Sequence, residues 1–184
     1  MVKFFAHPSA FVEEGAQIGD DTKIWHAAQV RSGAVIGKNC ILGKNAYVDK
    51  GVIIGNNVKI QNNVSVYHGA TIEDGVFLGP HALILNDKYP RAVTPSGEIK
   101  TDKDWVEGKV IIREGASIGA TATIFPNVTI GKYALIGACS AVVKNIPDHA
   151  LAYGNPAKVV GFVCKCGFKI EKGKTCEKCK FMLK

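Results

Sequence analysis

The sequence predicts an all-β protein in which the chain winds as a parallel β-solenoid, leaves it once in a long loop, and ends in a small metal-binding knuckle. Three observations predict this arrangement. Aliphatic residues recur at every sixth position through most of the 184 residues, the repeat breaks once and resumes, and four cysteines gather near the C-terminus.

The six-residue period runs unbroken from Val12 to Ile84, where every sixth position carries Ile, Val or Leu, and it resumes from Ile112 to Val142. Four residues after each aliphatic position comes a small or β-branched residue, and the corner between them is mostly Gly, Asn or Asp, which tolerate a positive φ. Such a period fits neither a helix nor a single strand. It fits a short strand followed by a corner, and stacking such units buries the aliphatic side chains.

The interruption lies between Ile84 and Ile112. In an unbroken repeat the next aliphatic residue would stand at position 90, which is Pro90, so the repeat returns late and the extra residues form a loop from about Asn86 to Gly108. Loops of this length inside compact domains are mostly functional, and a disordered surface insertion is the alternative.

The tail carries two pairs of thiols, Cys164 with Cys166 and Cys176 with Cys179, separated by nine residues. This is the spacing of a four-cysteine metal site, for which we favour structural zinc, with iron as the alternative because four thiolates also suit it. Cys40 and Cys139 are assigned to no metal. We therefore divide the chain into a solenoid domain, residues 1–161, and a zinc-ribbon-like tail, residues 162–184.

The formal net charge is +7, but residues 164–184 hold seven Lys against two Glu, so most of the excess lies in the tail. The nearly balanced body argues against a nucleic-acid partner. No apolar run approaches the ~20 residues that span a bilayer, and the first residues do not form a secretory signal. We expect a cytoplasmic protein without membrane insertion.

The hexads at residues 36–41 (Ile-Gly-Lys-Asn-Cys-Ile) and 118–123 (Ile-Gly-Ala-Thr-Ala-Thr) resemble those of hexapeptide-repeat acyltransferases, and the resemblance covers residues 7–161. It implies a left-handed parallel β-helix with three hexads per coil. The Gly-Asn-Pro-Ala-Lys segment at 154–158 is similar to the ending that closes the coenzyme A site in this family.

The segments 24–26, 59–67 and 86–91 narrow the resemblance to N-acetyltransferases of nucleotide-linked amino sugars, such as those acting on UDP-2-acetamido-3-amino-2,3-dideoxy-glucuronate. The resemblance implies acetyl-CoA as cosubstrate, the 3-amino group of a UDP-3-amino uronate as acceptor, and a role in the synthesis of O-antigen-like surface polysaccharide precursors. It also implies a homotrimer with sites between subunits. His81 departs from the family, in which a small residue follows Gly79-Pro80.

With three hexads per coil, residues 18 apart stack about 4.8 Å from each other, the spacing of neighbouring strands. His68 is thus expected directly beneath Asn86, at the mouth of the loop. By resemblance Asn86 orients the sugar amine, and His68 is a candidate base. Two alternatives stay open: the amine needs no protein base, or His68 is an exposed residue of the outer face.

The remaining candidates are contacts. Positive side chains suit a diphosphate or a uronate carboxylate, and small corner residues let pantetheine run beside the backbone. The substrate candidates are His26, Arg31, Gln61, Asn62, Lys88, Tyr89 and Arg91. The coenzyme candidates are Gly119, Ala120, Gly137, Ala138, Lys144 and Lys158. For the trimer we expect flat apolar walls that include Val52, Val58 and Val64.

Two other function classes compete. A γ-type carbonic anhydrase uses the same solenoid with histidine-bound zinc, but residues 82–148 contain no His. A non-enzymatic scaffold is the third class, and it differs from a transferase in that it does not bind acetyl-CoA.

Overall fold

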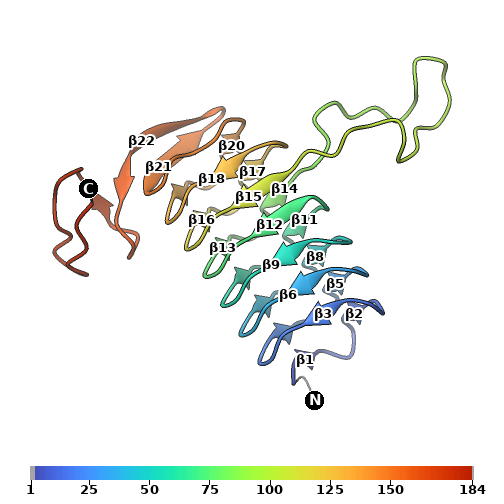
Figure 1. Cartoon of the computed structure of the whole chain (residues 1–184), viewed down its shortest axis with the longest axis horizontal. Coiled ribbons are helices and arrows are strands. Elements are labelled where there is room, and N and C mark those ends of the chain that lie inside the picture. The colour runs from blue at the N-terminus through green and yellow to red at the C-terminus, as the bar shows by residue number, and fades with distance from the viewer. Residues whose placement is uncertain (1–2, 184) are drawn as a thin grey trace.

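In the computed structural model, which describes residues 3–183, three short strands and three corners make one coil, and the coils stack into a prism of three sheets (Figure 1). Residues 1, 2 and 184, which belong to the two predicted domains, lie outside the described residues. The predicted parallel β-solenoid is confirmed, and the described residues contain no helix. Its left-handed sense stays a prediction.

The first sheet joins one strand of each coil and then continues into the tail. Its strands are β1 (Phe5–Ala6), β4 (Lys23–Ile24), β7 (Ile41–Leu42), β10 (Lys59–Ile60), β13 (Phe77–Leu78), β16 (Ser117–Ile118), β19 (Leu135–Ile136), β21 (Ala150–Gly154), β22 (Ala157–Val163) and β23 (Lys169–Ile170). All pairings up to β21 are parallel, and the last two are antiparallel.

The other two sheets are parallel throughout. The second contains β2 (Phe11–Val12), β5 (Gln29–Val30), β8 (Tyr47–Val48), β11 (Ser65–Val66), β14 (Leu83–Ile84), β17 (Thr123–Ile124) and β20 (Ala141–Val142). The third contains β3 (Gln17–Ile18), β6 (Val35–Ile36), β9 (Ile53–Ile54), β12 (Ala70–Ile72), β15 (Val110–Ile112) and β18 (Thr129–Ile130).

The pairing register confirms three hexads per coil. Lys59 pairs with Ile41 on one side and with Phe77 on the other, and each partner is three hexads away along the chain. Phe77 pairs next with Ser117, and the longer step between these two contains the loop, which leaves the coil and returns to it in phase. Figure 1 shows this loop projecting from the side of the solenoid between β14 and β15.

Three edges run along the prism where the corners stack. We call the edge between the first and second sheets edge 1, that between the second and third sheets edge 2, and that between the third and first sheets edge 3. Positive φ recurs at the corners, as the repeat predicts for Asn39 (56°) and Asn63 (60°). His81 (60°), Thr121 (58°) and other corner residues adopt it too, so stacking imposes the corner even where the residue type does not favour it.

The aliphatic residue of each coil strand points inward, and residues such as Ile24, Leu42 and Ile60 are fully buried. The small residues of the repeat join them in one continuous core. Val52, Val58 and Val64 also belong to this core with 0% exposure, so the prediction that they form an outer wall for trimer contacts is wrong. They occupy the inward small-residue position, and the exposed apolar residues of the third sheet include Val35, Ile53 and Ile111.

Glycines on edge 1 are required by the close approach of successive coils. A Cβ on Gly119 would lie 2.4 Å from the backbone nitrogen of Ala138. We expect Gly119→Ala to lower the free energy of unfolding by about 1–3 kcal/mol, as overpacking does. Denaturant unfolding measures this, with Gly161→Ala as the control because, apart from its chain neighbours, no described residue has an atom within 4 Å of the added Cβ. Equal effects of the two substitutions would contradict the packing account.

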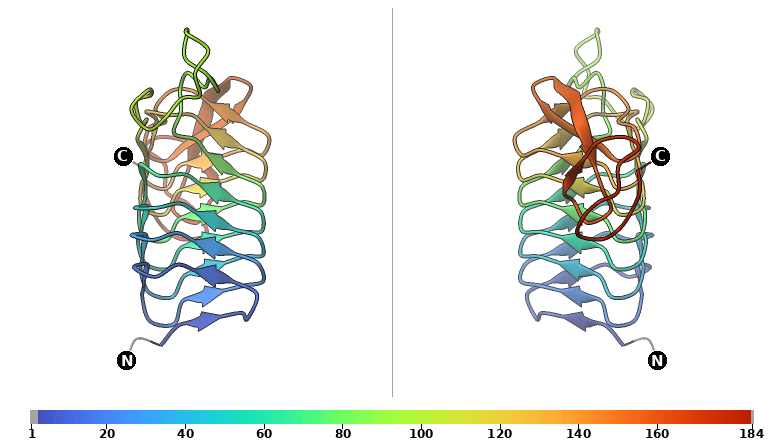
Figure 2. Two further views of the ribbon diagram at one scale, coloured as in Figure 1. Left: turned by 90° about the vertical axis from the view of Figure 1, so that its right-hand side faces the viewer. Right: turned by 90° about the vertical axis from the view of Figure 1, so that its left-hand side faces the viewer.

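The tail folds back along edge 3, as the two views of Figure 2 show. The rings of Tyr133, His149 and Phe181 stack in succession, with centroid separations of 5.3 and 4.9 Å. A cleft of about 610 Å³ separates residues 163–167 from the corners of edge 3. Strand β22 crosses residue 161, and the division into two domains at that point remains our proposal.

None of the elements formed by residues 3–183 is a helix long and apolar enough to cross a membrane.

Candidate functional site

The structure brings His68 and Asn86 together on edge 2, at the mouth of the loop. His68 follows β11 and Asn86 follows β14 in the next coil, so their side chains stack, and Asn86 Nδ2 lies 3.0 Å from His68 Nδ1. The loop closes beside them, because the N–H of Gly108 donates to the carbonyl of Asn86 at 2.7 Å. Both side chains are half-buried, which leaves them open to a ligand.

Asp49, which the sequence did not single out, is bonded to His68. Its Oδ2 lies 3.1 Å from His68 Nδ1 and also accepts the N–H of His68 at 3.4 Å. Its Oδ1 accepts the N–H of Lys50 and the hydroxyl of Tyr47. Burial alone would raise the pKa of the Asp49 carboxyl, but these donors together hold that pKa below its ordinary value. Asp49 is therefore an ionised group in a largely closed environment.

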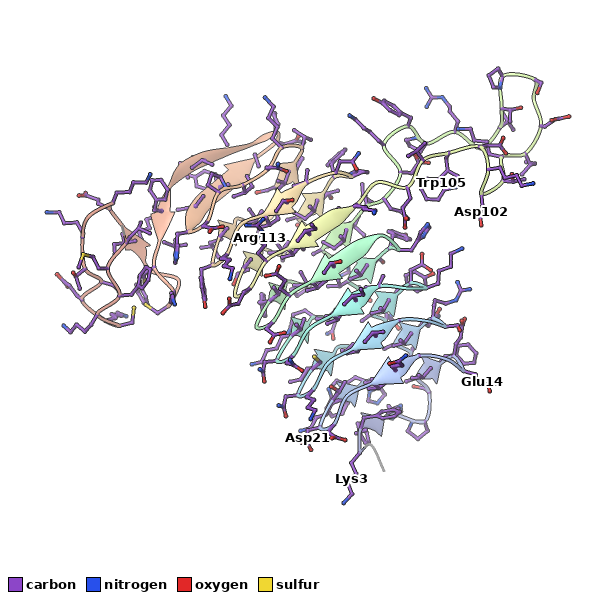
Figure 3. The ribbon with its side chains drawn as sticks, in the orientation of Figure 1. Lys3, Glu14, Asp21, Asp102, Trp105 and Arg113 are labelled. Atoms are coloured by element: carbon purple, nitrogen blue, oxygen red, sulfur yellow. The ribbon has the colours of Figure 1, made fainter. Side chains whose placement is uncertain are left out.

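The loop supplies a second carboxylate and an aromatic ring to His68. Glu107 Oε1 lies 3.5 Å from His68 Nε2, and the Trp105 ring meets the imidazole edge-on with centroids 5.3 Å apart. Figure 3 shows Trp105 and Asp102 on the projecting loop. Asp102 also lies 3.7 Å from the ammonium of Lys50. Both ends of the imidazole thus face a carboxylate, one from the solenoid and one from the loop.

Arg31, a predicted substrate contact, lies on the same edge but is engaged within the protein. Its Nε pairs with Glu13, and its Nη1 donates to the Tyr47 hydroxyl at 3.3 Å. The bond to Tyr47 and the charge of Glu13 raise the pKa of Arg31 above its ordinary value. The guanidinium lies 3.9 Å from Asp49 Oδ1, so Arg31 supports the carboxylate beneath His68.

Two of the three predicted loop contacts line one pocket. Lys88 and Tyr89, with Trp105, Val106 and others, enclose about 430 Å³. Arg91 is exposed and donates to the carbonyl of Pro90, and it does not belong to the residues that line this pocket.

The remaining predicted contacts lie mainly on edge 1. His26 stacks on His7 with ring centroids 3.6 Å apart, and Asn62 Oδ1 accepts the N–H of Lys44 in the coil below at 2.9 Å. Gln61 precedes Asn62 there, and the small coenzyme candidates Gly119, Ala120, Gly137 and Ala138 occupy later corners of the same edge. Lys144 follows β20 on edge 2, and the exposed Lys158 lies on β22. One chain therefore does not bring all the predicted contacts to one place.

The four tail cysteines converge as a metal site requires. Their sulfur atoms all lie within 4.8 Å of one another, with Cys164 Sγ 2.9 Å from Cys166 Sγ and 3.3 Å from Cys176 Sγ. All four are free thiols. Tetrahedral zinc with Zn–S bonds of about 2.3 Å places sulfurs about 3.8 Å apart, so a small adjustment of the sulfurs fits the set to the ion. Backbone N–H groups, first that of Cys179, lower the pKa of Cys176 to about 6, which favours the ligating thiolate.

The sequence contained a signal for Asp49 near His68, but none for Glu107. Asp49 stands one coil below His68 and one position further back, so the same stacking rule that joins His68 to Asn86 places it nearby. Asp49 also stacks in register with Glu13 and Arg31, since the three residues are 18 apart. Three stacked charged residues were a signal in the sequence that this part of the edge has a role. Glu107 lies in the loop, where no repeat fixes the path, and nothing in the sequence connected it to His68.

Comparisons with known proteins agree with the repeat. Residues 15–50 and 51–86 match the bacterial transferase hexapeptide (six repeats) model, and residues 33–68 match the hexapeptide repeat of succinyl-transferase. The dTDP-3-amino-3,6-dideoxy-alpha-D-galactopyranose 3-N-acetyltransferase of Aneurinibacillus thermoaerophilus is 52% identical over 64 residues, 35% of this chain and 33% of that protein. Serine acetyltransferase of Haemophilus influenzae is 40% identical over 87 residues, 47% of this chain and 32% of that protein. The chain spans about a third of the length of these relatives.

Solved structures share the fold at low identity. The acetyltransferase domain of PglB from Neisseria gonorrhoeae, in complex with acetyl coenzyme A, aligns with a TM-score of 0.52 and 23% identity, over 86% of this chain and 58% of that one. WeeI from Acinetobacter baumannii aligns with a TM-score of 0.50 and 20% identity, over 83% and 56%.

Proposed function

We propose that this hexapeptide-repeat protein, whose coils over residues 15–86 belong to the bacterial transferase hexapeptide family, transfers acetyl from acetyl-CoA to the amino group of a nucleotide-linked sugar. The observation that carries the proposal is the pairing of His68 with Asn86 at the mouth of the loop. The relative that is 52% identical over 64 residues acts on a dTDP-linked 3-amino sugar, which supports an acceptor of this class.

The acceptor we propose is the 3-amino group of a UDP-3-amino uronate, in a cytoplasmic pathway to surface polysaccharide. The loop pocket offers Lys88 and Lys100 as partners for an anionic group and the rings of Tyr89 and Trp105 as a packing surface, while Asp87 and Asp104 balance the charge of its lining. A nucleotide diphosphate supplies the anion, and its base or sugar supplies a surface that packs on an aromatic ring.

In the reaction the amine nitrogen attacks the thioester carbonyl, a carbon–nitrogen bond forms, and the carbon–sulfur bond breaks. The amine loses one proton and the coenzyme thiolate gains one. We assign to Asn86 the orientation of the amine and to His68 the removal of its proton, which then passes to the thiolate.

We propose a homotrimer in which neighbouring chains complete the site. His68 and Asn86 lie on edge 2, whereas the small corner residues expected along pantetheine lie on edge 1, and the packed core separates these edges within one prism. A second copy that places its edge 1 against edge 2 joins the two sets. Sedimentation equilibrium is expected to give three times the chain mass of 19.7 kDa, and a stable monomer at micromolar concentration would refute it.

For the tail we propose one structural zinc ion held by Cys164, Cys166, Cys176 and Cys179, with iron as the alternative. Within residues 3–183, this is the single set of three or more metal-ligating side chains with converging donor atoms. A histidine-bound zinc site of the carbonic anhydrase type is not favoured, because residues 82–148 contain no His.

Release of coenzyme A with a panel of nucleotide amino sugars tests the function. We expect turnover with a 3-amino sugar nucleotide and little with the corresponding 3-hydroxy sugar, because a neutral amine is the better nucleophile. Turnover with none of the panel, together with no acetyl-CoA binding by calorimetry, would favour a non-enzymatic scaffold.

A further inference from the structure

We infer that Asp49 is the positioning residue of His68: its buried carboxylate keeps the imidazole proton on Nδ1 and leaves Nε2 as the nitrogen that faces the substrate. The catalytic meaning of this inference rests on the proposed function. The protonation pattern of the ring follows from the contacts of the protein alone.

The carboxylate is held firmly in place. Its side chain is only 11% exposed. Oδ1 accepts the N–H of Lys50 at 2.8 Å and the Tyr47 hydroxyl at 3.0 Å, which leaves Oδ2 directed at His68. An ionised carboxylate accepts hydrogen bonds and donates none. Asp49 therefore fixes an acceptor, and a negative charge, beside Nδ1.

The contacts of Nδ1 determine which ring nitrogen carries the hydrogen and how the Asn86 amide is oriented. Asp49 Oδ2 lies 3.1 Å from Nδ1 and Asn86 Nδ2 lies 3.0 Å from it. One ring nitrogen does not donate to the carboxylate and accept from the amide at the same time. The carboxylate is the charged partner of Nδ1, and Asp49 is both closer to the ring and less exposed than Glu107, which lies 3.5 Å from Nε2, so Nδ1 carries the hydrogen. The Asn86 amide then turns its oxygen toward the ring, and its two N–H groups are free for other acceptors.

Nε2 points toward the loop. The Glu107 carboxylate lies 3.5 Å from it, and the Trp105 ring lies beside the imidazole with the centroids 5.3 Å apart. The charged groups that face the ring are thus Asp49 from edge 2 and Glu107 from the loop. A sugar amine that displaces the exposed Glu107 carboxylate from the ring meets Nε2, with its lone pair available when the ring is neutral. Asp49 never touches this amine and acts through His68.

The test combines a spectroscopic and a kinetic measurement on the full chain. Nitrogen-15 NMR of labelled histidine side chains at about pH 9, where imidazole is neutral, is expected to show His68 as the Nδ1–H tautomer. The His68→Gln spectrum assigns the signal. Asp49→Asn is expected to move His68 toward the Nε2–H tautomer and to lower kcat about 10²-fold, the lower end of what a general base contributes. The KM for acetyl-CoA is expected to change little.

Asp74→Asn is the matched control, since Asp74 Oδ1 also accepts a corner N–H, that of Asn56, but lies on edge 3 away from His68. It is expected to keep both the tautomer and kcat. An Nε2–H tautomer in the wild type would overturn the inference, even if Asp49→Asn fails to fold. Unchanged tautomer and kcat in a folded Asp49→Asn would overturn it too. If the tautomer shifts as expected but no amino sugar is acetylated, the proposed function fails and the positioning of the ring by Asp49 stands.

Discussion

Replacing Asn86 with Ala is expected to lower kcat by about 10²–10³-fold, because removal of one well-placed polar contact in a closed site costs about 2.7–4 kcal/mol in the barrier. Asn86 stacks on His68 and its backbone carbonyl closes the loop through Gly108. The substitution leaves that backbone bond in place. Acetyl-CoA binding, measured by calorimetry, is therefore expected to remain nearly intact while turnover of the amino sugar falls.

Asn56→Ala is the control for this substitution. Asn56 Oδ1 accepts the N–H of Lys38 in the coil below, so it is another corner asparagine, but it lies on edge 3. We expect its kcat to match the wild type. Full activity of Asn86→Ala with a confirmed amino-sugar substrate would place the reacting centre elsewhere in the solenoid. His68→Ala separately tests the base: if its kcat equals that of the wild type at neutral pH, the sugar amine needs no protein base.

Replacing Cys176 with Ser is expected to remove the metal from the tail. Purified without chelator, the wild type is expected to contain one zinc or iron per chain by elemental analysis, and the variant less than a tenth of that. Structural zinc contributes about 10–16 kcal/mol of binding free energy in small finger peptides, so the tail depends strongly on it. The substitution also removes the sulfur through which the turn after β23 contacts Cys164.

The tail of the metal-free variant is expected to separate from edge 3, because the Phe181–His149 stack then lacks a rigid support. Trypsin is expected to cut the variant rapidly after tail residues such as Lys172, while the solenoid stays resistant. Cys139→Ser is the control, since this exposed cysteine lies outside the cluster, and its metal content is expected to be unchanged. Wild-type protein that contains neither metal would contradict the site.

The sequence predicted the solenoid well because a strict repeat constrains every coil in the same way. Inward positions, corners, and the stacking of His68 under Asn86 all follow from counting in hexads and in coils of three hexads. It failed where the count was not applied. Val52, Val58 and Val64 stand at the small-residue position of the repeat, which points inward, but they were assigned to an outer wall on their aliphatic character alone, and all three are buried.

The environment of the candidate site was harder to predict than its position. The contact of Arg31 with a ligand stays a prediction, but its pairing with Glu13 and Tyr47 was not predicted, because Arg31 was considered alone and not together with the charges one coil away. Glu107 reaches His68 from a loop that no repeat governs. The metal ligands were predicted from the spacing of the cysteines. Each pair needs only a short separation in the sequence to bind a metal, whatever the fold of the segment between the two pairs.

The return of the loop to the coil it left has a consequence for how this protein can diversify. Lys59 pairs with Phe77 across an ordinary coil, and Phe77 pairs with Ser117 across the coil with the loop, so the loop roughly doubles the length of chain between paired strands. Each doubling of a flexible segment adds only about 0.6 kcal/mol of closure entropy. Insertions or deletions between Asn86 and Gly108 therefore cost the coil stack little, provided the ends still meet. Natural variation in acceptor sugar is expected to accumulate in this segment, on a scaffold that stays unchanged around it.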